Sequence, residues 1–234
     1  MASIQDVFSE RLQLLCRRYP PSSRKRILVA LAGSPGSGKT TITASLVQSF
    51  NARSEIKIQV VPMDGFHYSK AKLSTIESTE CPFQRRGAPF TFDAESFLLL
   101  IRKLRDESIT EHDEPERAIW APSFDHAKKD PVEQDIRIPS SQQIIIIEGN
   151  YLLLDENPWN QIQDLVDETW FVSVERQTAK ERLIARHIAA GIETNRPAAE
   201  ARVESNDLRN GDLIRERLII PNVIVESFDR VLMV

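Results

Sequence analysis

Residues 31–41 of the chain, LAGSPGSGKTT, combine the residue types that bind a nucleotide phosphate, and residues 33–40 match the pattern G-x-x-x-x-G-K-[ST] in full. In such a loop, glycines let backbone N–H groups point at phosphate oxygens, and the following helix adds the positive end of its dipole. Lys39 can then reach the β and γ phosphates, and the Thr40 hydroxyl can coordinate Mg²⁺. The simpler alternative is an ordinary turn between a strand and a helix. The residues expected to bind ATP are Gly33, Ser34, Pro35, Gly36, Ser37, Gly38, Lys39, Thr40 and Thr41.

A carboxylate follows the consecutive isoleucines of residues 144–147. Such an apolar run is typical of a parallel strand that is covered on both faces. Glu148 therefore stands where the core ends, and open α/β sheets bind ligands beyond the carboxyl ends of their strands. We expect Glu148 to hold Mg²⁺ beside Thr40; the alternative is that it caps the following turn.

A second carboxylate, Asp64, ends the apolar run VVPMD. A carboxylate at a strand end, near a γ-phosphate, can accept the proton of an attacking hydroxyl, as a kinase requires. The alternative is that it binds Mg²⁺ through water. His67 and Tyr68 follow closely and could form the wall of a site for a small polar acceptor, or could simply pack in the loop.

Apolar runs alternate with helical patterns along the chain, which predicts a doubly wound, mostly parallel α/β sheet. Asp93 is expected to cap the helix that follows it. The expected strands lie within residues 26–33, 56–64, 118–125, 142–154, 169–175, 222–227 and 230–234, and the expected helices within residues 1–21, 39–50, 92–107, 178–190 and 198–210.

Composition limits the classes of protein that the chain can belong to. With 234 residues, of which 41% are hydrophobic, residues 1–234 fit a single domain. The net charge of −4 argues against nucleic acid as a partner. No apolar run approaches the roughly 18 residues that would span a membrane. The oligomeric state stays open.

The N-terminus and the cysteines bear on the compartment. Residues 1–21 contain Asp6 and Glu10 and lack a continuous apolar stretch, so they predict a packed amphipathic helix and not a secretory signal. Cys16 and Cys81 follow no metal-binding or redox spacing. The sequence therefore predicts a reducing compartment, the cytoplasm.

Taken together, these motifs resemble the phosphoribulokinase/uridine kinase family, which also contains the type I pantothenate kinases and nicotinamide riboside kinases. The resemblance extends from about Arg26 to Glu226 and is carried by VVPMDGFHY, GAPFTFDAESF, APSFD and IIIIEGNYLLL. It implies a P-loop kinase fold with a helical lid at about residues 176–212. It also implies ATP and Mg²⁺ as cofactors, and a small-molecule alcohol as the acceptor of the γ-phosphate.

The resemblance assigns roles to single residues. Asp64 matches the catalytic base of the family, and Glu148 matches its Mg²⁺-linked acid. Asp93, in FTFDAESF, stands where uridine kinases have FDHPDAF, whose first aspartate holds substrate hydroxyls. Phe124, in APSFD, stands where they carry the tyrosine of VPVYDF that lines the acceptor pocket.

Two arginines fall in the segment that resembles the lid. The resemblance implies that Arg182 and Arg186 clamp the transferring phosphoryl group together with Lys39, since a guanidinium can neutralise the charge on its oxygens. The alternative is a solvated helix face. Further along, Asn206, Asp207 and Asn210 could lie near the adenine, although such residues before a glycine also mark a helix end.

The chain departs from uridine kinases at two places. After the catalytic aspartate it reads Gly-Phe-His-Tyr and not Ser-Phe-Tyr, which is closer to the Asp-Gly-Phe of pantothenate kinases, and its lid lacks the RGR string. A nucleoside of the uridine or cytidine type ranks first as the acceptor because of Asp93, with pantothenate or a sugar next. An acceptor-independent P-loop ATPase and a GTPase-like switch are other classes, and the chain has no Asn-Lys-x-Asp string to select guanine.

Overall fold

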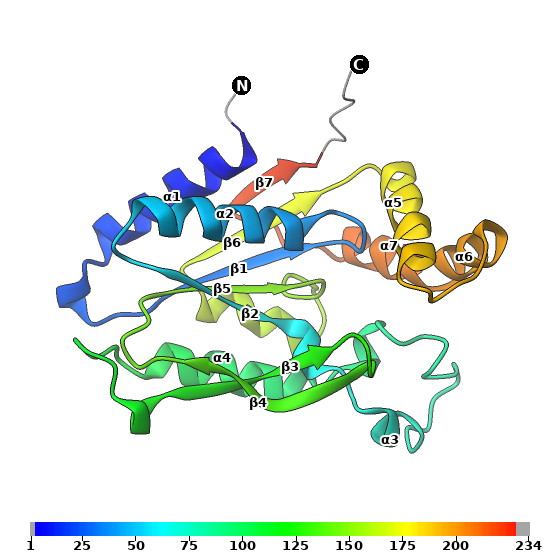
Figure 1. The fold of residues 1–234 in the computed structure, drawn as a ribbon, viewed down its shortest axis with the longest axis horizontal. Helices are drawn as coiled ribbons and strands as arrows, with labels where there is room; N and C mark the ends of the chain where they lie inside the picture. The colour runs from blue at the N-terminus through cyan, green and yellow to red at the C-terminus, as the bar shows by residue number, and fades with distance from the viewer. Residues whose placement is uncertain (1–2, 228–234) are drawn as a thin grey trace.

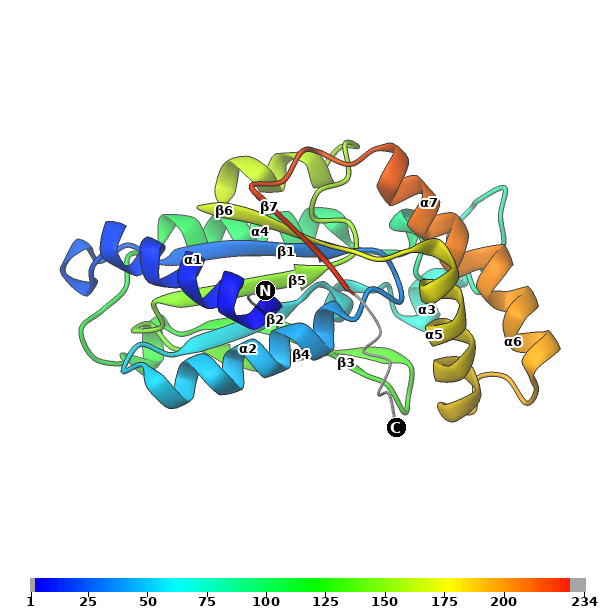
Figure 2. The same cartoon turned by 90° about the horizontal axis from the view of Figure 1, so that it is seen from above.

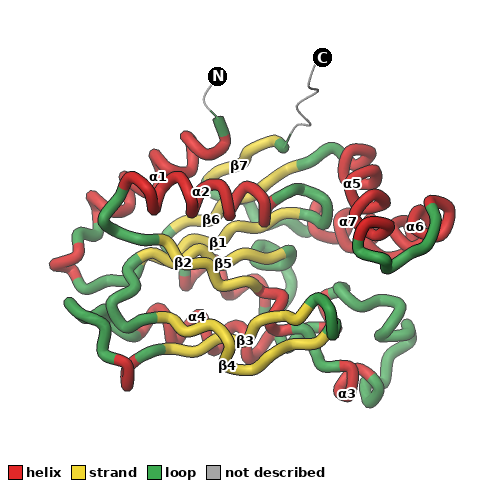
Figure 3. Tube along the Cα trace, in the orientation of Figure 1, coloured by secondary structure: helices red, strands yellow, loops and turns green. Residues whose placement is uncertain are grey.

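A parallel sheet forms the centre of the protein in the computed structural model, which describes residues 3–227. In these residues five strands pair in the order β2-β5-β1-β6-β7, all parallel (Figure 3). The strands are β1 (Ile27–Gly33), β2 (Ile58–Pro62), β5 (Ile144–Gly149), β6 (Glu168–Ser173) and β7 (Val223–Glu226). The expected α/β sheet is confirmed, while the strand expected at residues 230–234 lies outside the described residues.

Helices cover both faces of this sheet, as Figures 1 and 2 show. The helices are α1 (Ile4–Arg18), α2 (Lys39–Arg53), α3 (Lys70–Leu73), α4 (Ala94–Asp106), α5 (Arg176–Ala189), α6 (Arg196–Arg202) and α7 (Leu208–Glu216). Alternate residues of the central strands point to opposite faces: Leu31 and Ile146 pack with α1 and α2, whereas Ala30 and Ile147 pack with α4. Because both faces are buried, β1 and β5 need continuous apolar sequences.

The helix expected within residues 1–21 forms, and Asp93 caps its helix as expected. At the N-terminus, Ser3 and Asp6 form a reciprocal capping box for α1, and the ring of Phe8 stacks on Trp170 with centroids 4.3 Å apart. Asp93 caps α4, since its side chain accepts a 3.0 Å hydrogen bond from the backbone N–H of Ser96. The N-terminal segment is thus a packed helix.

An antiparallel hairpin lies below the sheet in Figure 1 and is made of β3 (Ile119–Asp125) and β4 (Asp130–Ile138). The sequence predicts β3 but not β4, whose residues 133–135 are exposed and polar. A strand that leaves much of its length in water carries little apolar pattern to identify it.

Helices α5, α6 and α7 lie at one end of the sheet and form the segment expected to be the lid (Figure 2). Leu183, Ala199 and Leu208 belong to a small core of their own between these helices. A π-helical turn, Val203–Asp207, interrupts the helix expected over residues 198–210 and joins α6 to α7. A π-turn inside a helix frequently marks a functional region.

Within residues 3–227, none of the helices is long and apolar enough to span a membrane. Cys16 and Cys81 are both free cysteines.

Candidate active site

The register of the sheet brings Glu148, Asp64 and the phosphate loop together at the carboxyl ends of three neighbouring strands. Glu148 on β5 is the neighbour of Leu31 on β1 and of Pro62 on β2. The phosphate loop follows β1, and Asp64 follows β2 in a short 3₁₀ turn, Met63–Phe66. Asp64 therefore stands just beyond its strand, and not at its last residue as the sequence suggests. All three groups meet at the carboxyl ends of parallel strands, where such sheets bind ligands.

The loop at residues 33–41 has the backbone that a phosphate site requires. Gly38 has φ of +79°, a conformation that favours glycine, and it precedes α2 without any side-chain cap. The first N–H groups of α2 are therefore left without a capping side chain, which is the arrangement that accepts an anion. Ser37 is fully buried, and its Oγ finds no hydrogen-bond partner among the described residues.

Lys39 begins α2 and extends its ammonium toward the carboxylates of the site. Its Nζ donates a 2.6 Å hydrogen bond to Oδ1 of Asn150. Burial lowers the pKa of Lys39, the charges of Glu148 and Asp64 oppose that shift, and Arg186 adds to it. Glu148, Asp64 and Arg186 thus all act electrostatically on one ammonium group, and a bound polyanion would favour its charged form.

Thr40 and Glu148 supply the oxygen atoms that Mg²⁺ prefers. The Thr40 hydroxyl donates a 2.6 Å hydrogen bond to Oε1 of Glu148, which is only 8% exposed. Residues 3–227 contain no cluster of three or more His, Cys, Asp or Glu side chains that could hold a metal. The Thr40 hydroxyl and the Glu148 carboxylate alone still fit Mg²⁺, because this ion commonly uses one or two protein oxygens and completes its shell with phosphate oxygens and water.

A cavity of about 260 Å³ lies beside the Asp64 turn, and its lining includes the predicted acceptor residues His67, Tyr68 and Asp93. Burial raises the pKa of Tyr68, and the nearby Asp93 adds to this effect. His67, Tyr68 and Asp93 thus line one cavity, and Asp93 also serves as the α4 cap.

His67 both packs and lines this cavity. Its Nδ1 lies 2.8 Å from the backbone oxygen of Asp64, and its ring lies 4.0 Å from that of Phe92 and 4.8 Å from that of Phe124. Burial lowers the pKa of His67, which favours the neutral ring. Phe124 thus packs against His67 from β3 and does not itself line the cavity.

Gly65 lets the hairpin pack on the Asp64 turn. A Cβ atom at this position would lie 2.1 Å from the backbone oxygen of Pro122 on β3, which is far inside van der Waals contact. Any side chain here would push the hairpin away from the turn that carries Asp64 and His67.

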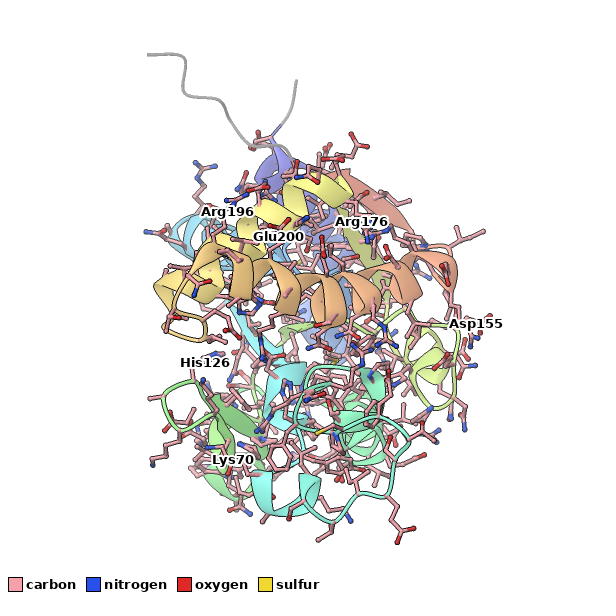
Figure 4. All side chains as sticks on the ribbon, turned by 90° about the vertical axis from the view of Figure 1, so that its right-hand side faces the viewer. Lys70, His126, Asp155, Arg176, Arg196 and Glu200 are labelled. Carbon is pink, nitrogen blue, oxygen red and sulfur yellow. The ribbon has the colours of Figure 1, made fainter. Side chains whose placement is uncertain are left out.

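Both predicted lid arginines lie near the phosphate loop. Nη1 of Arg182 donates to the backbone oxygen of Gly36 at 3.2 Å and to Oγ of Ser227 at 2.9 Å. Arg186, one turn further along α5, is exposed and affects the pKa of Lys39. Other charges of the lid pair with one another: Arg196 with Glu181, and Lys180 with Glu200, as the labelled outer side chains in Figure 4 help to locate.

Comparison with known proteins decides the family. The model of the Phosphoribulokinase / Uridine kinase family matches residues 28–193. The chain belongs to the phosphoribulokinase/uridine kinase family. A relative from Schizosaccharomyces pombe named "Putative uridine kinase" is 36% identical over 229 residues, which cover 97% of this chain and 92% of that protein.

Solved structures agree with this membership. A crystal structure from Silicibacter sp. TM1040, described as that of a "putative fructose transport system kinase", has a TM-score of 0.79 and 31% identity, covering 93% of this chain and 98% of that one. The structure of YFH7 from Saccharomyces cerevisiae has a TM-score of 0.82 and 23% identity, covering 97% and 100% of the two chains, and shares the fold. The expected enzyme class, an ATP-dependent kinase, is confirmed.

The structure gives other partners to the residues that sequence analysis associates with adenine. Asn206 and Asn210 are buried in and beside the π-turn, where their side-chain oxygens accept hydrogen bonds from Arg85. Asp207 contacts His187 of α5, with 2.9 Å between Oδ2 and Nε2. In this member of the phosphoribulokinase/uridine kinase family, Asn206 and Asn210 thus hold the lid to the loop that carries Arg85, and Asp207 links two elements within the lid.

Two residues of the site escape the sequence analysis. Asn150 contacts the Lys39 ammonium, and Arg86 lies beside Phe124, with its Cζ 5.5 Å from the ring centroid. The position of Asn150, two residues after Glu148 at the end of an apolar strand, is a signal that could have identified it. Nothing in the pair Arg85-Arg86 distinguishes one arginine from the other.

Proposed function

We propose that this kinase transfers the γ-phosphate of ATP to a hydroxyl group of a small polyhydroxylated metabolite. The observation that carries the proposal is that Lys39, Glu148 and Asp64 lie at the carboxyl ends of three neighbouring strands, with a cavity beside the Asp64 turn that can receive an acceptor. Residues 1–234 would act as one kinase domain in the cytoplasm, with residues 176–212 as its lid.

The phosphate loop binds the nucleotide in this proposal. Its N–H groups and the Lys39 ammonium hold the triphosphate, with Thr40 and Glu148 as the oxygen donors for Mg²⁺. Mg²⁺, when bound, would neutralise charge on the phosphate oxygens. The buried, unpartnered Ser37 hydroxyl supports a ligand at this loop.

Asp64 receives a proton in the transfer step. The acceptor oxygen forms a bond to the γ-phosphorus, the bond from that phosphorus to the bridging oxygen of the β-phosphate breaks, and ADP leaves. The proton of the acceptor hydroxyl passes to the Asp64 carboxylate. Arg182 and Arg186 would donate to the transferring phosphoryl group from α5, and closure of the lid would exclude water as a competing acceptor.

The acceptor classes raised by sequence and relatives can be separated by experiment. A nucleoside is supported by Asp93 at the cavity and by the name of the S. pombe relative, and a sugar by the description of the Silicibacter structure. We would measure ADP release with ATP and Mg²⁺ in the presence of ribonucleosides, pantothenate or sugars. Acceptor-dependent release is the expected result. Equal release with and without every acceptor would indicate an ATPase and contradict the proposal.

A further inference from the structure

Two consecutive arginines in the loop between α3 and α4 have opposite surroundings. Arg85 has protein partners for its donors: Nε contacts Glu80 at 3.0 Å, Nη1 contacts Oδ1 of Asn206 at 2.6 Å, and Nη2 contacts Oδ1 of Asn210 at 3.1 Å. Asn206 also donates to the backbone oxygen of Arg86 at 2.9 Å. Arg85 therefore fastens this loop to the lid and fixes the backbone of its neighbour.

Arg86 is largely buried, yet some of its N–H donors have no hydrogen-bond partner among the described residues. Its side chain is 14% exposed, and its hydrogen bonds come from Nη2 alone: 2.9 Å to the backbone oxygen of Tyr68 and a longer 3.4 Å contact with Asp130. Its Nε is buried without a hydrogen-bond partner in the part of the chain that the structure describes. Because a buried donor without a partner costs free energy, this pattern points to a ligand that supplies the missing acceptor.

The position of Arg86 indicates which ligand this is. Its guanidinium lies over the ring of Phe124, which packs on His67, and it holds the carbonyl of Tyr68; His67 and Tyr68 both line the acceptor cavity. His126 lies on the hairpin in the same neighbourhood, with its ring 5.2 Å from that of Phe124 (Figure 4). Arg86 thus stands beside the part of the cavity wall that His67 and Tyr68 form.

The charges around the cavity are of two kinds. Asp93 and Glu133 line the cavity and Asp64 lies next to the lining residue His67; these carboxylates accept hydrogen bonds from hydroxyl groups. Lys72 lines the cavity and Arg86 stands beside its wall; both present only donors, and Arg86 presents them in the planar arrangement that matches a carboxylate or a phosphate. One small molecule could satisfy both kinds of group if it carried hydroxyls and an acidic group.

We propose that Arg86 is an acceptor-binding residue and that the acceptor is a hydroxylated compound with an acidic group, either a carboxylate or a phosphate ester. Arg85 is a positioning residue that holds Arg86 in place. This inference rests on the proposed function, because it identifies the substrate class of the same site.

Equilibrium binding tests the inference without relying on turnover. We would titrate the wild-type chain, loaded with Mg²⁺ and a non-hydrolysable ATP analogue, with glycerate and glycerol, with fructose 1-phosphate and fructose, and with uridine. One acidic compound should bind about 10- to 100-fold more tightly than its neutral partner, since charge-assisted hydrogen bonds are the stronger ones. A difference between glycerate and glycerol would indicate a site for a carboxylate, and a difference between fructose 1-phosphate and fructose would indicate a site for a phosphate ester. If neither pair favours its acid, or if uridine binds most tightly, the inference is overturned.

Variants connect the preference to Arg86. In Arg86→Gln the preference for the acid should fall to about the level of the neutral compound, and Arg86→Lys, which keeps the charge but not the planar arrangement, should restore part of it. The matched control is Arg102→Gln, because Arg102 is an exposed arginine that contacts Gln161 on the surface. Unchanged preference in a folded Arg86→Gln would overturn the inference; if that variant does not fold, the Arg86→Lys and wild-type measurements still decide it.

The two proposals fail in different ways. If an acidic compound binds through Arg86 but no ADP forms with it or with any other acceptor, the kinase reaction proposed above is wrong and the acidic site stands. If ADP forms only with neutral acceptors, the kinase reaction stands and the acidic site is wrong.

Discussion

The two ends of the central sheet use the same types of polar residue in opposite ways. At the amino end, Arg26 is 2% exposed, the side chain of Asp167 is 4% exposed, and both are paired with protein groups. At the carboxyl end, the turn that carries Asp64 lies beside a cavity, and the hydroxyl of Ser37 is left without a partner in the described chain. The polar groups of the amino end are paired with other protein groups, whereas the carboxyl end keeps polar groups that a ligand can pair with.

Arg26 shows how complete the amino end is. Its Nε donates to the backbone oxygen of Gln142 at 3.0 Å, and its Nη1 donates to those of Leu104 and Glu107 at 3.1 and 3.2 Å. These last two carbonyls belong to the final turn and the C-cap of α4, where intrahelical partners run out. Arg26 thereby ties β1 to the end of α4.

Asp167 plays the corresponding role next to β1. It accepts a 2.9 Å hydrogen bond from the backbone N–H of Leu28 and contacts Arg105 at 2.8 Å and Lys25 at 2.9 Å. Although burial raises the pKa of Asp167, the hydrogen bonds outweigh this effect and the pKa falls below its usual value. The comparison therefore predicts that changes at the carboxyl end lower activity, while changes at the amino end lower stability.

The largest effect is expected from Asp64→Asn. An amide of the same shape cannot accept the proton of the acceptor hydroxyl, so kcat should fall by about 10²–10⁴ while the melting temperature stays nearly constant. Steady-state kinetics and thermal unfolding measure the two quantities. The control is Asp155→Asn at an exposed position (Figure 4), which should change neither. Near-normal turnover in Asp64→Asn would remove Asp64 from this role.

Lys39→Met should have the next largest effect. Loss of the ammonium removes a positive charge from both the bound triphosphate and the transition state, so kcat/KM for ATP should fall by about 10²–10³. Stability should change little, because the cost of burying the ammonium offsets its hydrogen bond to Asn150 and its attraction to Glu148 and Asp64. Calorimetry with Mg-ATP and urea unfolding test the two parts. Unchanged ATP affinity and rate would contradict the assignment of the phosphate loop.

The contrast between the two ends also explains what the sequence could predict. Strands β1 and β5 are identified by their continuous apolar runs. Lys39 is located by the glycine-rich motif, because phosphate binding requires that spacing of residues, and Glu148 is located as an acid at the end of an apolar strand. β4 is missed because exposed polar residues carry no core pattern, and the π-turn is missed because its residues continue a helical pattern.

Arg85 and Arg86 show where sequence reasoning ends. The two side chains are identical and adjacent, and their different roles depend on partners such as Asn206, which is 121 residues away from Arg85. Folding selects those partners, and no local propensity records the choice. The amino-end residues Arg26 and Asp167 escape notice for the same reason, since their partners include Gln142 and Arg105.

At the amino end, Arg26→Met should reduce stability and leave the reaction unchanged. The apolar replacement leaves the buried carbonyls of Leu104 and Gln142 without their donor, so the free energy of unfolding should fall by about 2–4 kcal/mol. Urea unfolding measures this loss, and kcat at a temperature well below unfolding should remain within about twofold of wild type. A variant with normal stability and a large loss of kcat would reverse the proposed division between the two ends.

The smallest effect, and the one with a pH signature, is expected from Asp167→Asn. Because the pKa of Asp167 is lowered in the folded protein, its contribution to stability is present above the unfolded pKa of about 4 and is lost as the pH falls through the folded pKa. The variant should therefore be about 1–2 kcal/mol less stable than wild type at pH 7, with the difference shrinking below about pH 4. Urea unfolding at pH 7 and at pH 3 measures it. A difference that stays constant over this range would show that the amide loses packing alone, and that the charge of Asp167 does not stabilise the amino end.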